Sequence, residues 1–336
     1  MSTRNVLHSL GGCIVTHVAA CLPLIALGLQ SLPAGAQGFP NKPIRIIVGV
    51  PAGSGQDVEA RQLAAIMTAE LGQTVVIENR PGDAQLLAMG VVAKAMPDGY
   101  TLGGGQISNL AANPRLFDKP PYDVERDFVP VSLSIKHPWL LYVNAAVPAT
   151  TLQEFIALAK AKPNTITYAS TGPGNLLHVS MEWFQILTGT KLRHVPYGAT
   201  PWTNDVLSGE VQSVMFPLVT MTDHVRSGKL RALAISNGKE RSAQMPNVPM
   251  FAEAGLGQFE VTAWAGLVAP AGTPKEIVEK LGAAAARAAQ TPQYREFAAK
   301  FGATAVGSSP AEFDTFLKSE RARWKKVIAD AGIRVE

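Results

Sequence analysis

The chain has 336 residues, of which 47% are hydrophobic and 17% are charged. This composition supplies a buried core and excludes an intrinsically disordered chain, and the length predicts about two domains. The net charge is +4, with lysine and arginine scattered except for a cluster at 321–326, so we interpret it as a bias toward anionic ligands and not as a nucleic-acid footprint.

The first 36 residues have the layout of a secretory signal peptide. One basic residue, Arg4, precedes an apolar run over 11–29, and Ala34-Gly35-Ala36 is an A-x-A cleavage pattern. We expect cleavage after Ala36 and a periplasmic mature protein. Two alternatives stay open, a membrane anchor and a lipoprotein modified at Cys21, because residues 18–21 resemble a lipobox.

Both cysteines, Cys13 and Cys21, lie in this leader. A chain cleaved after Ala36 therefore has no disulfide, cysteine–metal site or cysteine nucleophile. No later segment is long and apolar enough to span a bilayer, so we expect the mature chain to be soluble.

After the leader, strand patterns alternate with helical patterns. The strand at 44–50 is nearly continuous in apolar residues, as buried parallel strands are, and a helix over 56–71 follows it. Ser54 and Asp57 have capping-box spacing, which predicts Ser54 as the N-cap. A strand at 74–78 completes a βαβ unit.

The alternation continues toward the C-terminus and indicates an α/β architecture with mostly parallel sheets. We predict helices over 86–95, 151–160, 175–187 and 201–207, and two or three more from residues 274, 292 and 310. We predict strands at 100–103, 129–134, 139–143, 166–169, 191–195, 211–216, 230–235 and 261–269.

Two glycine-rich turns each connect a strand to a helix, at 51–55 and at 170–174. A helix N-terminus carries unpaired N–H groups and a partial positive charge, and glycine lets an anion approach them closely. Ser54, Ser170 and Thr171 add hydroxyl donors. The two turns together predict a carboxylate site, and a purely structural βα turn is the alternative for each.

The sequence contains no pattern typical of an enzyme. Neither turn has the spacing of a dinucleotide fingerprint or a P-loop. The histidines after the leader have no metal-ligand spacing, and no nucleophile elbow is present. We interpret His178 as a paired histidine in the first turn of a helix rather than as a base for Ser170, and we expect no catalytic residue, metal or cofactor.

A series of motifs runs along the chain in a fixed order. They occupy residues 46–57 with Arg61, 78–82, 97–102, 121–123 with 127–131, 168–174 with His178, 194–197, 227–234 and 264–274. In this order they resemble the Bug proteins, the extracytoplasmic solute receptors of tripartite tricarboxylate transporters. The resemblance covers nearly all of the chain after the leader.

The resemblance implies a two-lobed periplasmic-binding-protein fold (Venus flytrap, type II) with a hinge between the lobes. We assign 1–36 to the signal peptide, 37–138 and 259–336 to lobe 1, and 139–258 to lobe 2. The implied function is capture of a small carboxylate for uptake by a tripartite tricarboxylate-type transporter, whose membrane components are the partners. We expect a monomer that binds no nucleic acid. The alternatives are a sensory or structural receptor-like protein without a transport role, and a periplasmic hydrolase of small carboxylates.

The resemblance also assigns ligand contacts by position. They are Ala52, Gly53, Ser54 and Gly55 in one lobe, with Ser108 and Asn109 in a further cleft loop, and Ser170, Thr171, Gly172 and Gly174 in the other lobe, with Tyr197, Ala199, Thr200 and Trp202 in a variable segment. The ligand stays open among dicarboxylates, tricarboxylates, amino acids and aromatic acids.

The chain departs from the family pattern at the cleft. Asp83-Ala84-Gln85 stands where members commonly have Ala-Gly-Gly, and Asp83 either repels a polyanion or pairs with a ligand ammonium. Pro217 stands where many members carry an aspartate, to which ammonium binding is sometimes assigned. Trp202 indicates either an apolar ligand body stacked on the indole or a surface-packed side chain.

Overall fold

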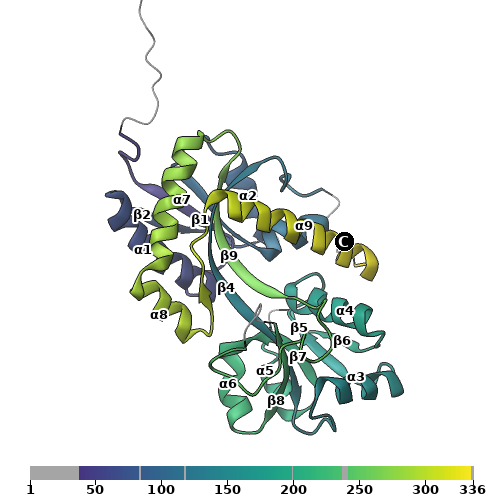
Figure 1. Cartoon of the computed structure of the whole chain (residues 1–336). Helices are drawn as coiled ribbons and strands as arrows, with labels where there is room; N and C mark the ends of the chain where they lie inside the picture. Colours follow the sequence, from purple (N-terminus) through teal and green to yellow (C-terminus); the bar gives the residue numbers. More distant parts are fainter. Residues whose placement is uncertain (1–37, 83–84, 117–118, 199, 237–240, 334–336) are drawn as a thin grey trace, which may run out of the picture. The chain divides into compact units, whose positions relative to one another are not determined.

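The computed structural model describes residues 38–82, 85–116, 119–198, 200–236 and 241–333. Its strands form two sheets that share one long strand, β4 (Phe128–Asn144), which Figure 1 shows running from one group of strands into the other. Residues 1–37, which carry the predicted signal peptide, lie outside the described part. Among the described residues, no helix has the length and apolar character needed to cross a membrane.

The first sheet begins with a βαβ unit. β1 (Ile44–Val48) pairs in parallel with β2 (Val75–Asn79) on one side and β3 (Thr101–Gln106) on the other. Helix α1 (Gly55–Leu71) connects β1 to β2, and α2 (Leu86–Ala93) connects β2 to β3. Each of these elements is predicted by the sequence, with shifts at the ends.

Antiparallel strands and C-terminal helices complete this half. β9 (Thr262–Pro270) pairs with β3 and with the first part of β4, and β10 (Thr304–Ala305) adds to β4. Helices α7 (Lys275–Gln290), α8 (Pro292–Lys300) and α9 (Pro310–Ala331) begin where the sequence predicts. A π-helical turn η2 (Ser108–Ala112) and a 3-10 turn η3 (Asn113–Arg115) follow β3.

The second sheet repeats the parallel arrangement. β5 (Thr167–Ser170) lies between β6 (Arg193–Pro196) and β7 (Ser213–Pro217), both parallel to it. The second part of β4 runs antiparallel to β7 and to β8 (Leu230–Ser236). The helices of this half are α3 (Leu152–Ala161), α4 (Leu176–Thr188), α5 (Thr203–Ser208) and α6 (Leu218–Arg226).

Strand β4 corrects the prediction of separate strands at 129–134 and 139–143, because it is one strand of 17 residues. Pro138 is the last residue paired with β9, and Trp139 is the first paired with β7 and β8. Proline has no N–H for a sheet ladder. It is tolerated here because it stands where the strand changes partners.

The prediction of mostly parallel sheets is also wrong. Each sheet contains three parallel strands, and β4, β8 and β9 pair antiparallel with their neighbours. The antiparallel pairs arise because the chain passes between the sheets twice. β4 leads from the first sheet to the second and β9 leads back, so these two neighbours run in opposite directions. Helix α6, η2 and β10 are not predicted by the sequence.

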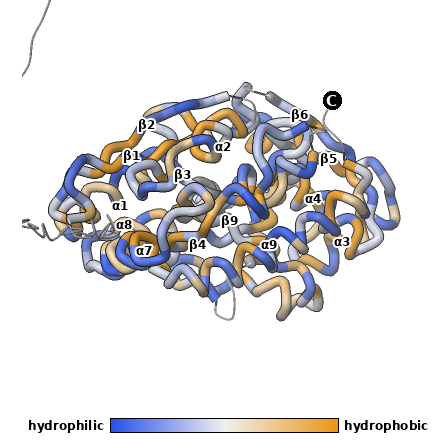
Figure 2. Tube along the Cα trace, turned by 90° about the horizontal axis from the view of Figure 1, so that it is seen from above, coloured by the Kyte–Doolittle hydropathy of each residue, from blue (hydrophilic) through white to orange (hydrophobic). Residues whose placement is uncertain are grey.

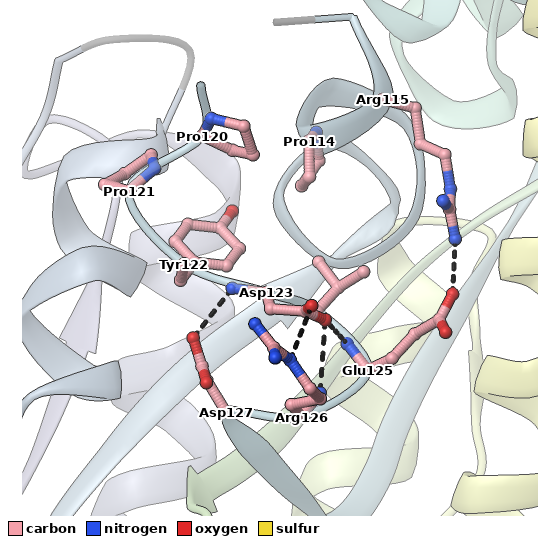
Figure 3. Close-up of a pocket in the computed structure, with 10 residues that line it drawn as sticks. Pro114, Arg115, Pro120, Pro121, Tyr122, Asp123, Glu125, Arg126 and Asp127 are labelled. Carbon is pink, nitrogen blue, oxygen red and sulfur yellow. Dashed lines mark hydrogen bonds and ion pairs between the residues drawn. The ribbon is translucent and has the colours of Figure 1, made fainter. Parts of the chain in front are cut away.

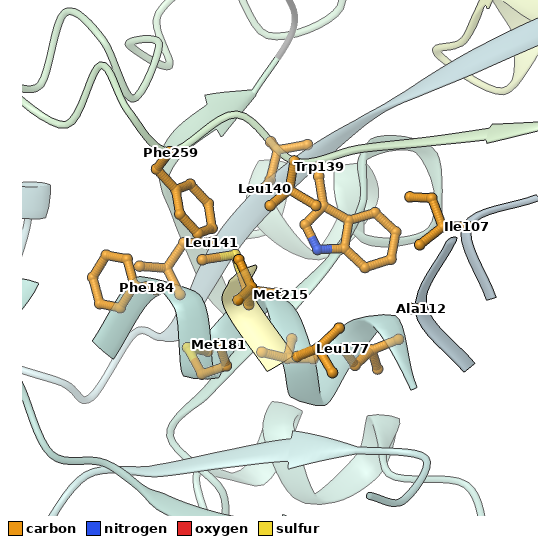
Figure 4. Close-up of a cluster of buried hydrophobic side chains, with 14 of the residues drawn as sticks. Ile107, Ala112, Trp139, Leu140, Leu141, Leu177, Met181, Phe184, Met215 and Phe259 are labelled. Atoms are coloured by element: carbon orange, nitrogen blue, oxygen red, sulfur yellow. The ribbon is translucent and has the colours of Figure 1, made fainter. Parts of the chain in front are cut away.

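A shared hydrophobic core joins the two sheets. Trp139 is 3% exposed, and its indole N–H donates to the Ser180 hydroxyl at 3.2 Å. Figure 4 shows this indole beside Ile107, which follows β3, and close to Leu177 of α4. The core therefore continues across the point where β4 changes sheets.

Helix α9 ties strand β9 to helix α4. The Glu320 carboxylate is 3% exposed and accepts hydrogen bonds from the indole N–H groups of Trp264 on β9, at 2.9 Å, and Trp324, at 3.2 Å. Arg323 Nη1 donates to the same carboxylate at 2.7 Å, and its guanidinium lies over the ring of Trp183 in α4. This helix carries both hydrophobic and hydrophilic residues, which Figure 2 colours along the tube.

Glu320→Ala should destabilise the protein, because it leaves two buried indole donors and a guanidinium without their common acceptor. We expect the free energy of unfolding to fall by about 3 kcal/mol, measured by urea denaturation. Lys325→Ala, at an exposed position of the same helix, is the control and should stay within about 0.5 kcal/mol of wild type. Equal stabilities for both variants would contradict the role of Glu320.

Candidate functional site

The first glycine-rich turn ends β1 and opens α1. Ser54 is the N-cap residue as predicted, but its hydroxyl makes no capping hydrogen bond, which corrects the capping-box prediction. Asp57 instead accepts from the Gly53 N–H at 2.8 Å and from Arg61 Nε at 2.9 Å. Asn79 Nδ2 also donates to it, at 2.8 Å. The Arg61 hydrogen bond, aided by the Gly53 and Asn79 donors, lowers the pKa of Asp57 to about 2, so this carboxylate fixes the turn.

The start of α1 holds polar atoms without protein partners. Within the described residues, Ser54 Oγ and both amide atoms of the Gln56 side chain are buried and lack hydrogen-bond partners. Ala52, Gly53 and Gly55 are exposed beside them. A buried polar group without a partner is costly, and native structures rarely keep one without a bound guest or ordered water. This turn is therefore the part of the predicted site best prepared for a ligand.

The second glycine-rich turn is closed by its own hydrogen bonds. The Gly172 N–H donates to Ser170 Oγ at 2.9 Å, and the Gly174 N–H donates to His178 Nδ1 at 3.0 Å. The Ser170 hydroxyl is fully buried and also hydrogen-bonded to His194 Nε2 at 2.6 Å. Thr171 stays exposed. Two amides that the sequence predicts as ligand donors are thus engaged inside the turn.

Two stacked histidines lie beside this turn. The ring centroids of His178 and His194 are 4.2 Å apart, and Tyr168 stacks on His194 at 4.9 Å. The Tyr168 hydroxyl donates to Glu182 at 2.5 Å, and this carboxylate lies 3.8 Å from His178 Nε2. Burial lowers the pKa of both histidines to about 4, and for His194 the nearby His178 lowers it further. The neutral His178 ring can accept the Gly174 N–H, so the prediction of a paired histidine is confirmed.

The Asn109 side chain is hydrogen-bonded to the protein's own backbone. It is fully buried; its Oδ1 accepts from the Gln106 N–H at 2.8 Å, and its Nδ2 donates to the Gly104 carbonyl at 3.1 Å. Ser108 is half-buried at the start of η2. Gln85 is not among the predicted contacts, but its Oε1 accepts from Nε2 of Gln106, which lines a pocket. Its departure from the family pattern was the signal that singled out this position.

The variable segment is only partly exposed. Trp202 is 6% exposed and packs edge-on against Phe216, with ring centroids 4.8 Å apart. The half-buried Tyr197 donates its hydroxyl to Asp205 at 2.6 Å, and Thr200 is exposed. Ala199 lies outside the described residues. The assignment of these four positions as ligand contacts stays a prediction.

A pocket of about 290 Å³ brings residues of both sheets together. It is lined by Gly55, Gln56, Glu59, Gln106, His137, Pro217, Ala263, Trp264, Ala265 and Phe301. Gly55 and Gln56 come from the start of α1, and Pro217 ends β7 of the second sheet. The turn at 170–174 is not among these lining residues, so the gripping of one ligand by both turns stays a prediction.

A larger pocket of about 500 Å³ lies between η3 and the start of β4 (Figure 3). Four of its charged groups form two ion pairs, Arg115 with Glu125 at 2.6 Å and Arg126 with Asp123 at 2.8 Å. None of the predicted contacts is among its ten described lining residues. Across all the described ranges, no group of three histidine, cysteine or acidic residues is arranged to hold a metal.

Two α/β halves joined by crossing strands, with a pocket lined from both, define a two-lobed solute-binding protein of the periplasmic-binding-protein class. The family model "Tripartite tricarboxylate transporter family receptor" matches residues 59–333, and the chain belongs to this family. The resemblance to the Bug proteins and the predicted fold class are thereby confirmed.

Known proteins are similar to this chain over nearly its whole length. Protein BugT of Bordetella pertussis is 35% identical over 314 residues, covering 93% of this chain and 96% of BugT. The solved structure of Rhodopseudomonas palustris Rpa4515 with adipate is 32% identical, with a TM-score of 0.75, 88% of this chain covered and 99% of that one. MatC from the same organism, with bound malate, is 33% identical, with a TM-score of 0.72 and coverage of 86% and 100%.

The lowered histidine pKa values predict a loss of stability in acid. In the unfolded chain His178 and His194 take up protons as the pH falls below about 6.5, whereas in the folded chain these two residues do so only near pH 4. The contribution of the two histidines to the free energy of unfolding is therefore complete above pH 6.5 and is lost as the pH falls toward 4. For each histidine the loss is about 1.4 kcal/mol per unit by which its pKa is lowered.

His178→Asn tests this origin, because asparagine keeps an acceptor for the Gly174 N–H but does not titrate. The free energy of unfolding, measured by urea denaturation between pH 7 and 4, should lose about half of its pH dependence. Asn204→Ser, at an exposed position of helix α5, is the control and should keep the wild-type slope. A wild-type slope in His178→Asn would show that the dependence arises elsewhere.

Proposed function

We propose that this chain captures a small carboxylate in the pocket between its two halves and delivers it to a transporter of the tripartite tricarboxylate type. The observation that carries the proposal is the start of α1, where Ser54 Oγ and the Gln56 amide lack partners beside a pocket lined from both sheets. The solved relatives titled with adipate and with malate support a carboxylate as the ligand.

Binding without chemistry is the second part of the proposal. The one arrangement among the described residues that resembles a nucleophile and its base is Ser170 with His194, at 2.6 Å. Ser170 is fully buried and already hydrogen-bonded to Gly172, so it offers no attacking oxygen to a ligand in the pocket. The relatives described as periplasmic binding proteins or receptors support the same interpretation.

Export and closure complete the proposal. We place the mature protein in the periplasm as a monomer cleaved after Ala36, with the membrane components of the transporter as its partners. Lobe 1 comprises 37–138 and 259–336, and lobe 2 comprises 139–258. The change of partners between Pro138 and Trp139 supports this boundary, because strands that pass between two sheets can act as the hinge.

Gly55→Asp should weaken carboxylate binding, because it places a negative charge at the start of α1, where the ligand anion is expected. The position suits substitution: Gly55 is not in the left-handed region, and a Cβ added there has no atom within 4 Å. A thermal-shift panel of adipate, malate, glutarate, benzoate and 4-aminobutyrate identifies the tightest probe. Calorimetry with that probe should show an affinity lower by about tenfold or more.

Gly55→Asn is the matched control, because it adds nearly the same volume without the charge. Its affinity for the probe should stay closer to wild type than to Gly55→Asp. Equal affinities for wild type and Gly55→Asp would contradict the assignment of the anion to this turn. If no member of the panel shifted the melting temperature of the wild type, carboxylate capture itself would be in conflict with experiment.

A further inference from the structure

Resting on the proposed function, we propose that Glu59 selects carboxylates that carry a cationic hydrogen-bond donor at their far end. Glu59 and the predicted anion-binding Gly55 line the same pocket. A pocket lined by an acid and by a helix N-terminus is suited to a ligand with opposite charges at its two ends.

The spacing of the two groups follows from helix geometry. Glu59 lies four residues after Gly55 in α1, so both residues are on one face of the helix, about 6 Å apart along its axis. A linear ligand with its carboxylate at Gly55 can therefore place its other end near Glu59. The pocket volume of about 290 Å³ is at the small end of the range for ligand sites and suits a short chain.

The Glu59 side chain is held in place and keeps one oxygen for a ligand. Its Oε1 lies 2.9 Å from His137 Nε2 on β4, and both side chains are 13% exposed. Within the described residues, Glu59 Oε2 makes no hydrogen bond or ion pair. The His137 contact orients the carboxylate, while the second oxygen stays available as an acceptor.

The other lining groups favour a donor and disfavour a second anion. The ten described lining residues include no lysine or arginine, and Pro217 contributes no N–H. The Gln56 amide, buried without a partner, can accept from or donate to the same group. A second carboxylate would meet the like charge of Glu59 in a partly buried site whose described lining has no lysine or arginine, whereas an ammonium would meet an acceptor of opposite charge.

The ligand class that satisfies these contacts is a short linear ω-amino carboxylate. Calorimetry should compare ω-amino carboxylates of one to five methylenes with the dicarboxylates of the same methylene number, such as 4-aminobutyrate with glutarate. For the best chain length, wild type should bind the amino form at least about tenfold more tightly than its dicarboxylate partner.

Glu59→Gln should remove that preference, lowering the affinity ratio by about tenfold or more, because glutamine keeps the shape and a hydrogen bond to His137 without the charge. Glu70→Gln, at an exposed position of the same helix, has the same change in net charge and should keep the wild-type ratio. The preference of the wild type is measurable even if Glu59→Gln fails to fold.

The outcomes separate this inference from the proposed function. Dicarboxylates bound as well as or better than amino carboxylates by the wild type would overturn the role of Glu59 and leave carboxylate capture standing. An unchanged ratio in a folded Glu59→Gln variant would overturn the role of Glu59 in the same way. Binding of neither series, nor of any carboxylate in the thermal-shift panel, would overturn the proposed function.

Discussion

The shared strand β4 is the constraint on which the arrangement of the molecule depends. Its first part pairs with β9 and its second part with β7 and β8, so one uninterrupted backbone belongs to both sheets. Trp139, at the change of partners, is buried in a core that includes residues from both halves. The ends of β1 and β7 are thereby brought to one pocket, at Gly55 and Pro217. In open α/β sheets, ligands bind in this position, beyond the carboxyl ends of parallel strands.

The two glycine-rich turns have different chemistry despite their similar sequences. In the first, Asp57 organises the turn from outside the pocket, and Ser54 and Gln56 keep unpartnered atoms. In the second, Ser170 and His178 take up the N–H groups of Gly172 and Gly174. The first turn is prepared for an anion, whereas the second has to exchange hydrogen bonds or use Thr171 to bind one. This asymmetry makes the start of α1 the centre of the proposed site.

The sequence predicts most elements of the fold because their apolar periodicity is strong, and the ordered motifs identify the family. Prediction from the sequence fails where contacts between distant residues determine a strand's length or a side chain's hydrogen-bond partner. β3 continues through Gly103, Gly104 and Gly105, which have weak strand propensity, because these residues pair with β9. A Cβ at Gly105 would clash with the Leu110 side chain, so glycine is required there. Likewise, the spacing of Ser54 and Asp57 fits a capping box, but the partner that Asp57 takes depends on Arg61 and Asn79. Position in a motif predicts Asn109 as a contact, and only the folded chain shows that its amide is used internally.

The most direct test of the account is backbone amide NMR of the isotopically labelled mature protein, titrated with the tightest carboxylate of the binding panel. The amides of Gly55 and Gln56 should show the largest shifts, with a smaller response at Thr171. A titration that moved residues 114–127 around the larger pocket, and left the start of α1 unchanged, would contradict the central claim.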